Sequence, residues 1–283
     1  MERLRSGETT IPYELFLELT SSLPEQERSI FSDKFELKNP NWGAIKGGQT
    51  TYKKHKNIFE RGRKIGSSRI KPKYRFDFNT ELTPDLCELI GAIIGDGFTN
   101  KYGNNYLVQI TGHKKLDKDY YVERLIPIIK KISPNSNPII SMSSGALRLT
   151  INSKEFHILL TKRFKMDAGK KTHIVKIPEE ILDSKNNLLI NSCLRGIFDT
   201  DGCVAFDKRN SYSTPYIRIV LQMLSKQLLG QVHTLLNKQG IKATITKNQQ
   251  YIQINGSENC KNFTDIVGFS NPRHLNKLKI FDL

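Results

Sequence analysis

Two nine-residue stretches decide the fold of this chain: LIGAIIGDG at residues 89–97 and LRGIFDTDG at residues 194–202. They share a leading Leu, an internal Gly, a central pair of apolar residues and a terminal Asp-Gly. Their terminal acids, Asp96 and Asp201, are 201 − 96 = 105 residues apart. Self-similarity at a fixed spacing is typical of internal repeats, so we predict two copies of one structural unit.

Each stretch is predicted to end a helix. The first helix follows Thr83-Pro84-Asp85, which supplies a capping hydroxyl, a proline at the first position and an early acid. The second is predicted to begin near Asn187. The segments that follow correspond element by element, and each half reads helix, strand, strand, helix, strand, strand, helix.

The predicted strands alternate between apolar and polar residues. Ile217 and Ile219 face one side of their strand, whereas Tyr216 and Arg218 face the other. Such strands bury one face on helices and expose a polar, partly basic face. We therefore predict an α+β fold with a mainly helical N-terminal region and two pseudo-symmetric αββαββα repeats, at residues 1–80, 81–185 and 186–283.

The predicted end of each motif helix has the chemistry of a metal site. A carboxylate at a helix C-terminus opposes the helix dipole at a cost of roughly 0.3–1 kcal/mol, and the last carbonyls there lack intrahelical donors. Carboxylate and carbonyl oxygens suit a hard cation such as Mg²⁺. Asp96 and Asp201, with Gly95 and Thr200, are therefore candidate ligands. The alternative is that each Asp-Gly only ends a helix or forms a turn, but the matched pair favours the metal site.

Small residues predict that the two motif helices pack closely against each other. Gly91 and Ala92 in the first helix, and Gly196 beside Ile197 in the second, leave little side chain between the backbones. Such packing would bring the two terminal acids together near a pseudo-two-fold axis. The polar, partly basic faces of two related sheets could form one long saddle. Two metal-binding acids beneath such a saddle suit metal-assisted hydrolysis of phosphodiesters on two antiparallel strands.

These residues resemble the LAGLIDADG homing endonuclease family in its single-chain, two-repeat (DOD) form. The resemblance covers residues 81–283, and LRGIFDTDG is a close match. In the first motif, Ile94 and Gly95 replace the usual inner acid and its small neighbour, whereas the terminal acid is retained. The resemblance implies a magnesium-dependent phosphodiester hydrolase. It further implies that this enzyme is a DNA endonuclease that makes double-strand breaks in a long DNA target and serves intron homing.

The resemblance also implies a lysine near the end of each repeat, close to the metals. Lys171 and Lys277 fit, because the intervals 171 − 96 = 75 and 277 − 201 = 76 nearly coincide, although abundant lysines can match a spacing by chance. Each would orient the attacking water and stabilise phosphate charge. The predicted polar strand faces supply candidate DNA contacts, which are Gln109, Arg148, Lys208, Arg209, Arg218, Gln222, Lys242 and Gln253.

The net charge of +16, from 44 basic and 28 acidic residues, predicts a polyanionic partner. Residues 1–37 carry 4 basic and 8 acidic side chains, whereas residues 38–75 carry 12 basic side chains and one acid. Helices predicted at 12–20, 24–36 and 51–61, with a short one ended by Gly47-Gly48, are typical of a helix-turn-helix module. The alternative is a helical cap followed by a basic linker.

Several classes are disfavoured by composition. No apolar run approaches the ~20 residues of a membrane span, the N-terminus has no apolar signal region, and the four cysteines form no CxxC pair. We expect a cytoplasmic monomer that binds double-stranded DNA, with intron RNA as a further partner and no membrane contact. The last residues lack the His-Asn of protein splicing, so an intein is not expected.

The remaining alternative is a nucleic-acid-binding protein of the same fold that does not cleave. An RNA-splicing maturase and a transcriptional regulator both belong to this class. Because the loss of cleavage is usually accompanied by the loss of an acid, the retention of Asp96 and Asp201 favours the enzyme.

Overall fold

The computed structural model describes residues 10–34, 36, 38, 41–68, 76–207 and 216–281. The chain divides into two compact units, residues 1–72 and 73–283. Two of the predicted DNA contacts, Lys208 and Arg209, lie outside the described residues. Within those residues, no helix has both the length and the apolar character needed to cross a membrane.

The first unit is helical, with α2 (Tyr13–Ser21), α3 (Glu25–Lys34), α4 (Trp42–Lys54) and α5 (Lys56–Ser68). The predicted end of a short helix at Gly47-Gly48 is wrong, because α4 continues through both glycines. Each glycine costs about 1 kcal/mol relative to alanine, yet the hydrogen-bond ladder persists until the His55 N–H donates to Thr51 O at 3.0 Å. Neither α4 nor α5 has a fully buried side chain, and the helix-turn-helix interpretation stays a prediction.

The two motif stretches form the buried helices α6 (Pro84–Asp96) and α10 (Asn187–Asp201). As predicted, the Thr83 hydroxyl caps α6 by accepting a hydrogen bond from Leu86 N at 3.2 Å. Every residue of α6 from Leu86 to Ile94 is buried. A helix that is buried all round belongs to the interior of its unit, so the motif helices form the centre of the fold.

The rest of the second unit follows the predicted pattern. The first repeat continues with β1 (Gly97–Tyr102), β2 (Asn105–His113), the π-helical η1 (Tyr120–Leu125), α7 (Ile126–Ile132), β3 (Ile139–Ser143), β4 (Ala146–Asn152), α8 (Lys154–Ile158) and the π-helical η2 (Leu159–Arg163). The second repeat, reached through α9 (Glu179–Leu182), continues with β5 (Gly202–Asp207), β6 (Tyr216–Gln222), α11 (Lys226–Lys238), β7 (Ala243–Ile245), β8 (Tyr251–Asn255) and α12 (Ser257–Ile266). It closes with α13 (Pro272–Leu278) and the 3-10 turn η3 (Lys279–Phe281).

The two sheets have the same topology. Their antiparallel strand orders are β1-β2-β4-β3 and β5-β6-β8-β7, which confirms the two-repeat α+β fold. One face of each sheet is buried, as Leu149 and Ile219 are fully inaccessible, and the other face is polar. Because β1 begins at Gly97 and β5 at Gly202, each terminal acid lies where its motif helix meets the first strand of its sheet.

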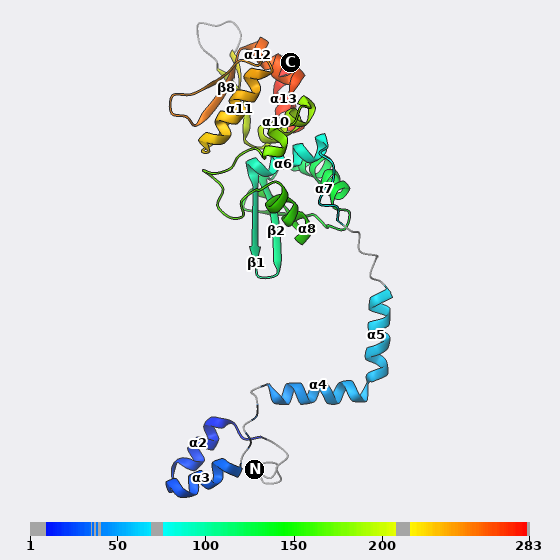
Figure 1. The fold of residues 1–283 in the computed structure, drawn as a ribbon, viewed down its shortest axis with the longest axis vertical. Helices are drawn as coiled ribbons and strands as arrows, with labels where there is room; N and C mark the ends of the chain where they lie inside the picture. The colour runs from blue at the N-terminus through cyan, green and yellow to red at the C-terminus, as the bar shows by residue number, and fades with distance from the viewer. Residues whose placement is uncertain are drawn as a thin grey trace. The chain divides into compact units, whose positions relative to one another are not determined.

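The helices α6 and α10 lie side by side in the middle of this unit, with one sheet to each side (Figure 1). A Cβ atom on Gly196 would lie 2.1 Å from Glu88 O and 2.7 Å from Ala92 N. A Cβ atom on Gly91 would similarly lie 3.0 Å from Ile197 N. Only glycine allows two backbones to approach so closely, and the structure places all four predicted interface residues in this contact.

Candidate active site

The C-terminal ends of α6 and α10 are in contact. A Cβ atom on Gly95 would lie 2.1 Å from Thr200 Oγ1 and 2.8 Å from Asp201 Oδ2, so the last turns of the two helices touch. Asp96 and Asp201 are both partly buried there. The packing of the helices therefore brings together the two acids that end the motifs.

Both carboxyl groups hold their protons more tightly than an exposed aspartate. The pKa of Asp96 is raised to about 7, chiefly by burial and also by the charges of Asp201 and Asp117, against the charges of Arg273 and Lys171, which lower it. Burial likewise raises the pKa of Asp201 to about 6, against the charges of Lys171 and Arg273. Two acids that repel each other in a poorly hydrated site gain from a counter-cation.

Lys171 donates to the last carbonyls of α6. Its Nζ lies 2.6 Å from Ile94 O and 3.0 Å from Gly95 O, and it also donates to Ile93 O. Burial lowers the pKa of Lys171 to about 8, while the two nearby aspartates raise it. A cation in this place satisfies orphan carbonyls and meets the negative end of the helix dipole.

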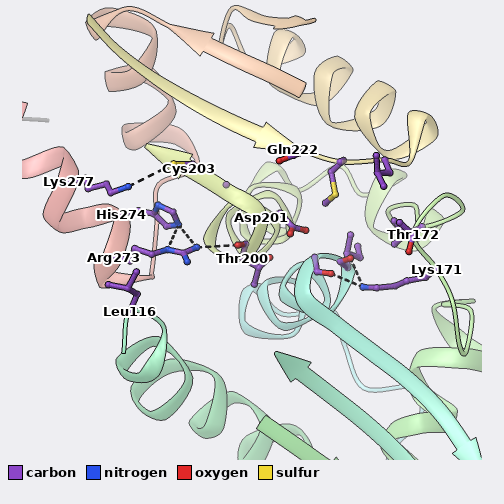
Figure 2. A pocket seen from close by; sticks show the side chains of 16 residues that line it. Leu116, Lys171, Thr172, Thr200, Asp201, Cys203, Gln222, Arg273, His274 and Lys277 are labelled. Carbon is purple, nitrogen blue, oxygen red and sulfur yellow. Dashed lines mark hydrogen bonds between the residues drawn. The ribbon is translucent and has the colours of Figure 1, made fainter. Parts of the chain in front are cut away.

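Arg273 contacts the end of α10 in the same way. Its Nη2 donates to Asp199 O at 3.3 Å and to Thr200 O at 3.2 Å (Figure 2). Its Nη1 forms an ion pair with Asp117, 3.1 Å from Oδ1. The two helix ends are thus each held by one buried or partly buried cation.

Sequence spacing missed Arg273 and favoured Lys277. The prediction from spacing assumes that the basic residue follows the terminal acid at the same interval in both repeats. This assumption does not allow for α13, with which the second repeat ends. The Asn271 side chain caps α13 by accepting from Arg273 N at 3.0 Å, which sets Arg273 in the first turn. Lys277 lies one turn later, with its Nζ 3.2 Å from Val204 O. The helix start Asn271-Pro272 was the signal that could have found Arg273.

A cleft of about 650 Å³ opens over the ends of the two helices. Figure 2 shows Asp201 at its floor, with Lys171 on one side and Arg273, His274 and Lys277 on the other. The cleft therefore combines Asp201, Lys171, Arg273 and Lys277 in one solvent-accessible site. Asp96 ends α6 directly after Gly95, which also lines the cleft.

The donor set fits a divalent cation with oxygen ligands. Mg²⁺ is commonly bound through one or two carboxylates, with water and phosphate oxygens completing the shell. Asp96 and Asp201 supply the carboxylates, whereas the carbonyls of Gly95 and Thr200 accept hydrogen bonds from Lys171 and Arg273. No cluster of three or more His, Cys, Asp or Glu side chains among the described residues could hold a metal, so water and substrate would have to supply further ligands.

The candidates for DNA contact that the structure describes lie on strands of the two sheets or directly next to a strand. Gln109 on β2 donates to Thr150 Oγ1 at 3.0 Å, and Arg148 on β4 is exposed. Arg218 on β6 forms an ion pair with Asp207 at 2.7 Å. The others are Gln222, which lines the cleft, Gln253 on β8, and the exposed Lys242 just before β7. Their contact with DNA stays a prediction.

A protein-family comparison identifies the second repeat. Residues 189–268 match the profile described as a LAGLIDADG-like domain, which confirms the predicted resemblance. The match contains the whole of the second motif and the sheet that follows it.

Two curated proteins of Methanocaldococcus jannaschii are similar to the chain. Its identity to the replication factor C small subunit is 29% over 246 residues, and to the isomerizing glutamine–fructose-6-phosphate aminotransferase 26% over 206 residues. The matches cover 82% and 70% of this chain, yet the chain spans only 12% and 17% of the length of those relatives.

Among solved structures, the chain is similar to I-DmoI in complex with DNA and Ca. The identity is 19% and the TM-score 0.47, and the match covers 68% of this chain and 95% of that one.

Proposed function

We propose that this chain, whose residues 189–268 match the profile of a LAGLIDADG-like domain, is a site-specific DNA endonuclease that makes metal-dependent double-strand breaks in a long target. The contact between the ends of α6 and α10 carries this proposal, because it brings Asp96 close enough to Asp201 for their charges to interact, at the edge of a cleft that Asp201 lines. Two acids related by an internal pseudo-two-fold suit the metal-assisted cutting of two antiparallel strands.

The proposed reaction is hydrolysis of a phosphodiester in each strand. A water oxygen attacks phosphorus, one P–O bond breaks, and its electron pair leaves on the departing oxygen, which takes up a proton. When bound, a divalent cation supplies Lewis-acid stabilisation of the developing charge, and Mg²⁺ is our choice of physiological ion. Asp96 and Asp201 would hold this cation, and Lys171 would add positive charge beside the phosphate.

The polar faces of the two sheets are the proposed DNA-binding surface. Gln and Arg side chains on these strands suit adenine and guanine edges as well as phosphates. The basic stretch at residues 38–75, with 12 basic side chains and one acid, would extend the contact along the duplex. We further propose that the protein acts as a monomer in the cytoplasm, that it serves intron homing, and that intron RNA is a second ligand.

Cleavage of a random-site DNA library tests the proposal. The full chain is incubated with the library and Mg²⁺, cut molecules are recovered and re-amplified, and the enriched site is then cut by wild type, Asp96→Asn and Asp201→Asn. Asp183→Asn is the matched control, because Asp183 is an exposed aspartate at the end of α9.

We expect wild type and Asp183→Asn to cut both strands of the enriched site. Both site variants should bind the same duplex in EDTA and lose at least about two orders of magnitude in cutting rate, the scale for removing a key electrostatic group. A wild type that binds duplexes of the library but yields no cut molecules with Mg²⁺ or with Mn²⁺ would instead establish the cleavage-deficient binding protein.

A further inference from the structure

We propose that Arg273 is the basic residue of the second motif, the counterpart of Lys171, and that Asp117 of the first repeat positions it. The inference rests on the proposed function, because it names which side chains equip each half of the cleft. It assigns roles to two residues that the repeat spacing does not single out.

The two cations bind equivalent atoms. With the offset of 105 residues between the motifs, Asp199 and Thr200 of α10 correspond to Ile94 and Gly95 of α6. Arg273 donates to the first pair of carbonyls and Lys171 to the second. Each cation therefore neutralises the end of one motif helix, directly before the acid that ends it.

Lys277 does not occupy an equivalent place. Its Nζ donates to Val204 O at 3.2 Å and lies 3.9 Å from Cys203 Sγ, both on β5. Figure 2 shows its side chain reaching Cys203, with Arg273 extending to Thr200. The charges that lower the pKa of Asp201 are those of Lys171 and Arg273.

Asp117 fixes the orientation of the Arg273 guanidinium from the other repeat. The Asp117 side chain is only 5% exposed and accepts from Arg273 Nη1 at 3.1 Å. It also accepts from His113 N at 2.7 Å and from Asn271 Nδ2 at 2.8 Å. With its carboxylate held by three donors, Asp117 has one orientation, and so has the guanidinium that it binds.

The second repeat in turn binds residues 171–177 of the first repeat, the segment that carries Lys171. Ser225 Oγ donates to Val175 O at 2.6 Å, and Gln231 Oε1 accepts from Ile177 N at 2.9 Å. Val175 N in turn donates to Lys171 O at 3.0 Å. Each repeat thus anchors the segment that carries the cation of the opposite motif, and both halves of the cleft depend on both repeats.

This arrangement has a strand-specific consequence. The pseudo-two-fold relates the two motifs to the two antiparallel strands, so one strand would be cut beside Lys171 and the other beside Arg273. Loss of one cation should slow one strand more than the other. A merely structural defect lowers the amount of active protein and slows both strands equally, so the ratio of the two rates separates the two explanations.

The experiment uses the enriched duplex, labelled differently on each strand, in single-turnover cutting by the full chain. The variants are Arg273→Ala, Arg273→Lys, Asp117→Asn, Lys171→Ala and Lys277→Ala, and Lys279→Ala is a charge-loss control on the exposed surface. Thermal unfolding of Arg273→Ala, Asp117→Ala and the double variant is measured without DNA or metal.

We expect Arg273→Ala to change the strand ratio at least about tenfold, and Lys171→Ala to change it in the opposite direction, as loss of an electrostatic group predicts. Arg273→Lys should restore most of the ratio, and Asp117→Asn should shift it in the same direction as Arg273→Ala. The double variant Arg273→Ala, Asp117→Ala should lower the unfolding midpoint by less than the sum of the shifts caused by Arg273→Ala and Asp117→Ala alone, since the two residues are in contact.

The proposal is overturned if Arg273→Ala leaves the ratio unchanged, or if Lys277→Ala shifts it instead. Additive shifts of the unfolding midpoint overturn the positioning role of Asp117 even if the chain cuts no DNA. Absence of cutting by wild type contradicts the proposed function, whereas an unchanged ratio in a protein that cuts contradicts only the present inference.

Discussion

Replacing Gly196 by alanine should separate the two motif helices. The new Cβ would lie 2.1 Å from Glu88 O, whereas ordinary contact begins at 3.4 Å, so the backbones must move apart by up to 3.4 − 2.1 = 1.3 Å. Neither atom can swing aside, because Glu88 O belongs to the backbone of a buried helix. Overpacking of this kind costs about 1–3 kcal/mol, and we expect the upper end of that range.

The net effect includes a compensating term. Alanine is better than glycine in a helix by about 1 kcal/mol, so Gly196→Ala should lower the free energy of unfolding by about 2 kcal/mol. For a unit of this size that corresponds to a decrease of about 4–8 °C in the unfolding midpoint. Because the ends of the helices carry Asp96 and Asp201, DNA cutting should fall by more than the folded fraction.

Chemical and thermal unfolding of wild type, Gly196→Ala and Gly230→Ala measure this effect. Gly230 lies on α11, where an added Cβ meets nothing within 4 Å, so its replacement should stabilise the protein by up to about 1 kcal/mol. If Gly196→Ala is as stable as Gly230→Ala, the close helix contact described above is wrong.

Three further predictions concern charges. Asp96 has a pKa of about 7 in the folded chain against 3.8 ordinarily, so the free energy of unfolding of wild type should fall as pH rises through this interval. Between pH 5 and pH 8 in EDTA, Asp96→Asn should therefore become more stable relative to wild type. Equal slopes of the unfolding free energy against pH for the two proteins, measured by urea unfolding, would contradict this. Glu88 is fully buried between Arg124 and Arg195, so Glu88→Gln should cost about 3–5 kcal/mol in the same assay, and a cost below about 1 kcal/mol would refute the buried ion pairs. If Arg148 contacts a phosphate, Arg148→Ala should reduce the slope of log Kd against log salt by about 0.9, measured by DNA binding in EDTA, and an unchanged slope would exclude that contact.

The motif helices and the repeat could be predicted because local signals and global packing agree there. The cap at Thr83, the apolar run and the small residues all favour one buried helix, and the structure forms it. The strand alternation likewise predicts which face of each sheet is buried. These features depend on periodicity and turn chemistry, which sequence carries directly.

The basic residues of the site depend on how each repeat ends, which the spacing of the motifs does not determine. The second repeat adds α13, and this helix explains why the second motif keeps its inner acid. Asp199 accepts from Ser270 N and Asn271 N, at 3.0 and 2.9 Å, and so fixes the chain before α13. Its counterpart Ile94 is packed in the core. The corresponding part of the first repeat has a turn, in which Ile174 N and Val175 N donate to Lys171 O. The departure in the first motif thus has a structural reason.

The pairing of Asp96 and Asp201 for metal-dependent cutting is tested most directly on the enriched duplex, with both strands labelled. Protein is bound in EDTA, and Mg²⁺ in excess then starts the reaction. Wild type should break both strands, and the double variant Asp96→Asn, Asp201→Asn should bind the duplex and break neither. Equal cutting by wild type and by the double variant, or cutting that continues without a divalent cation, would contradict the role of the two acids.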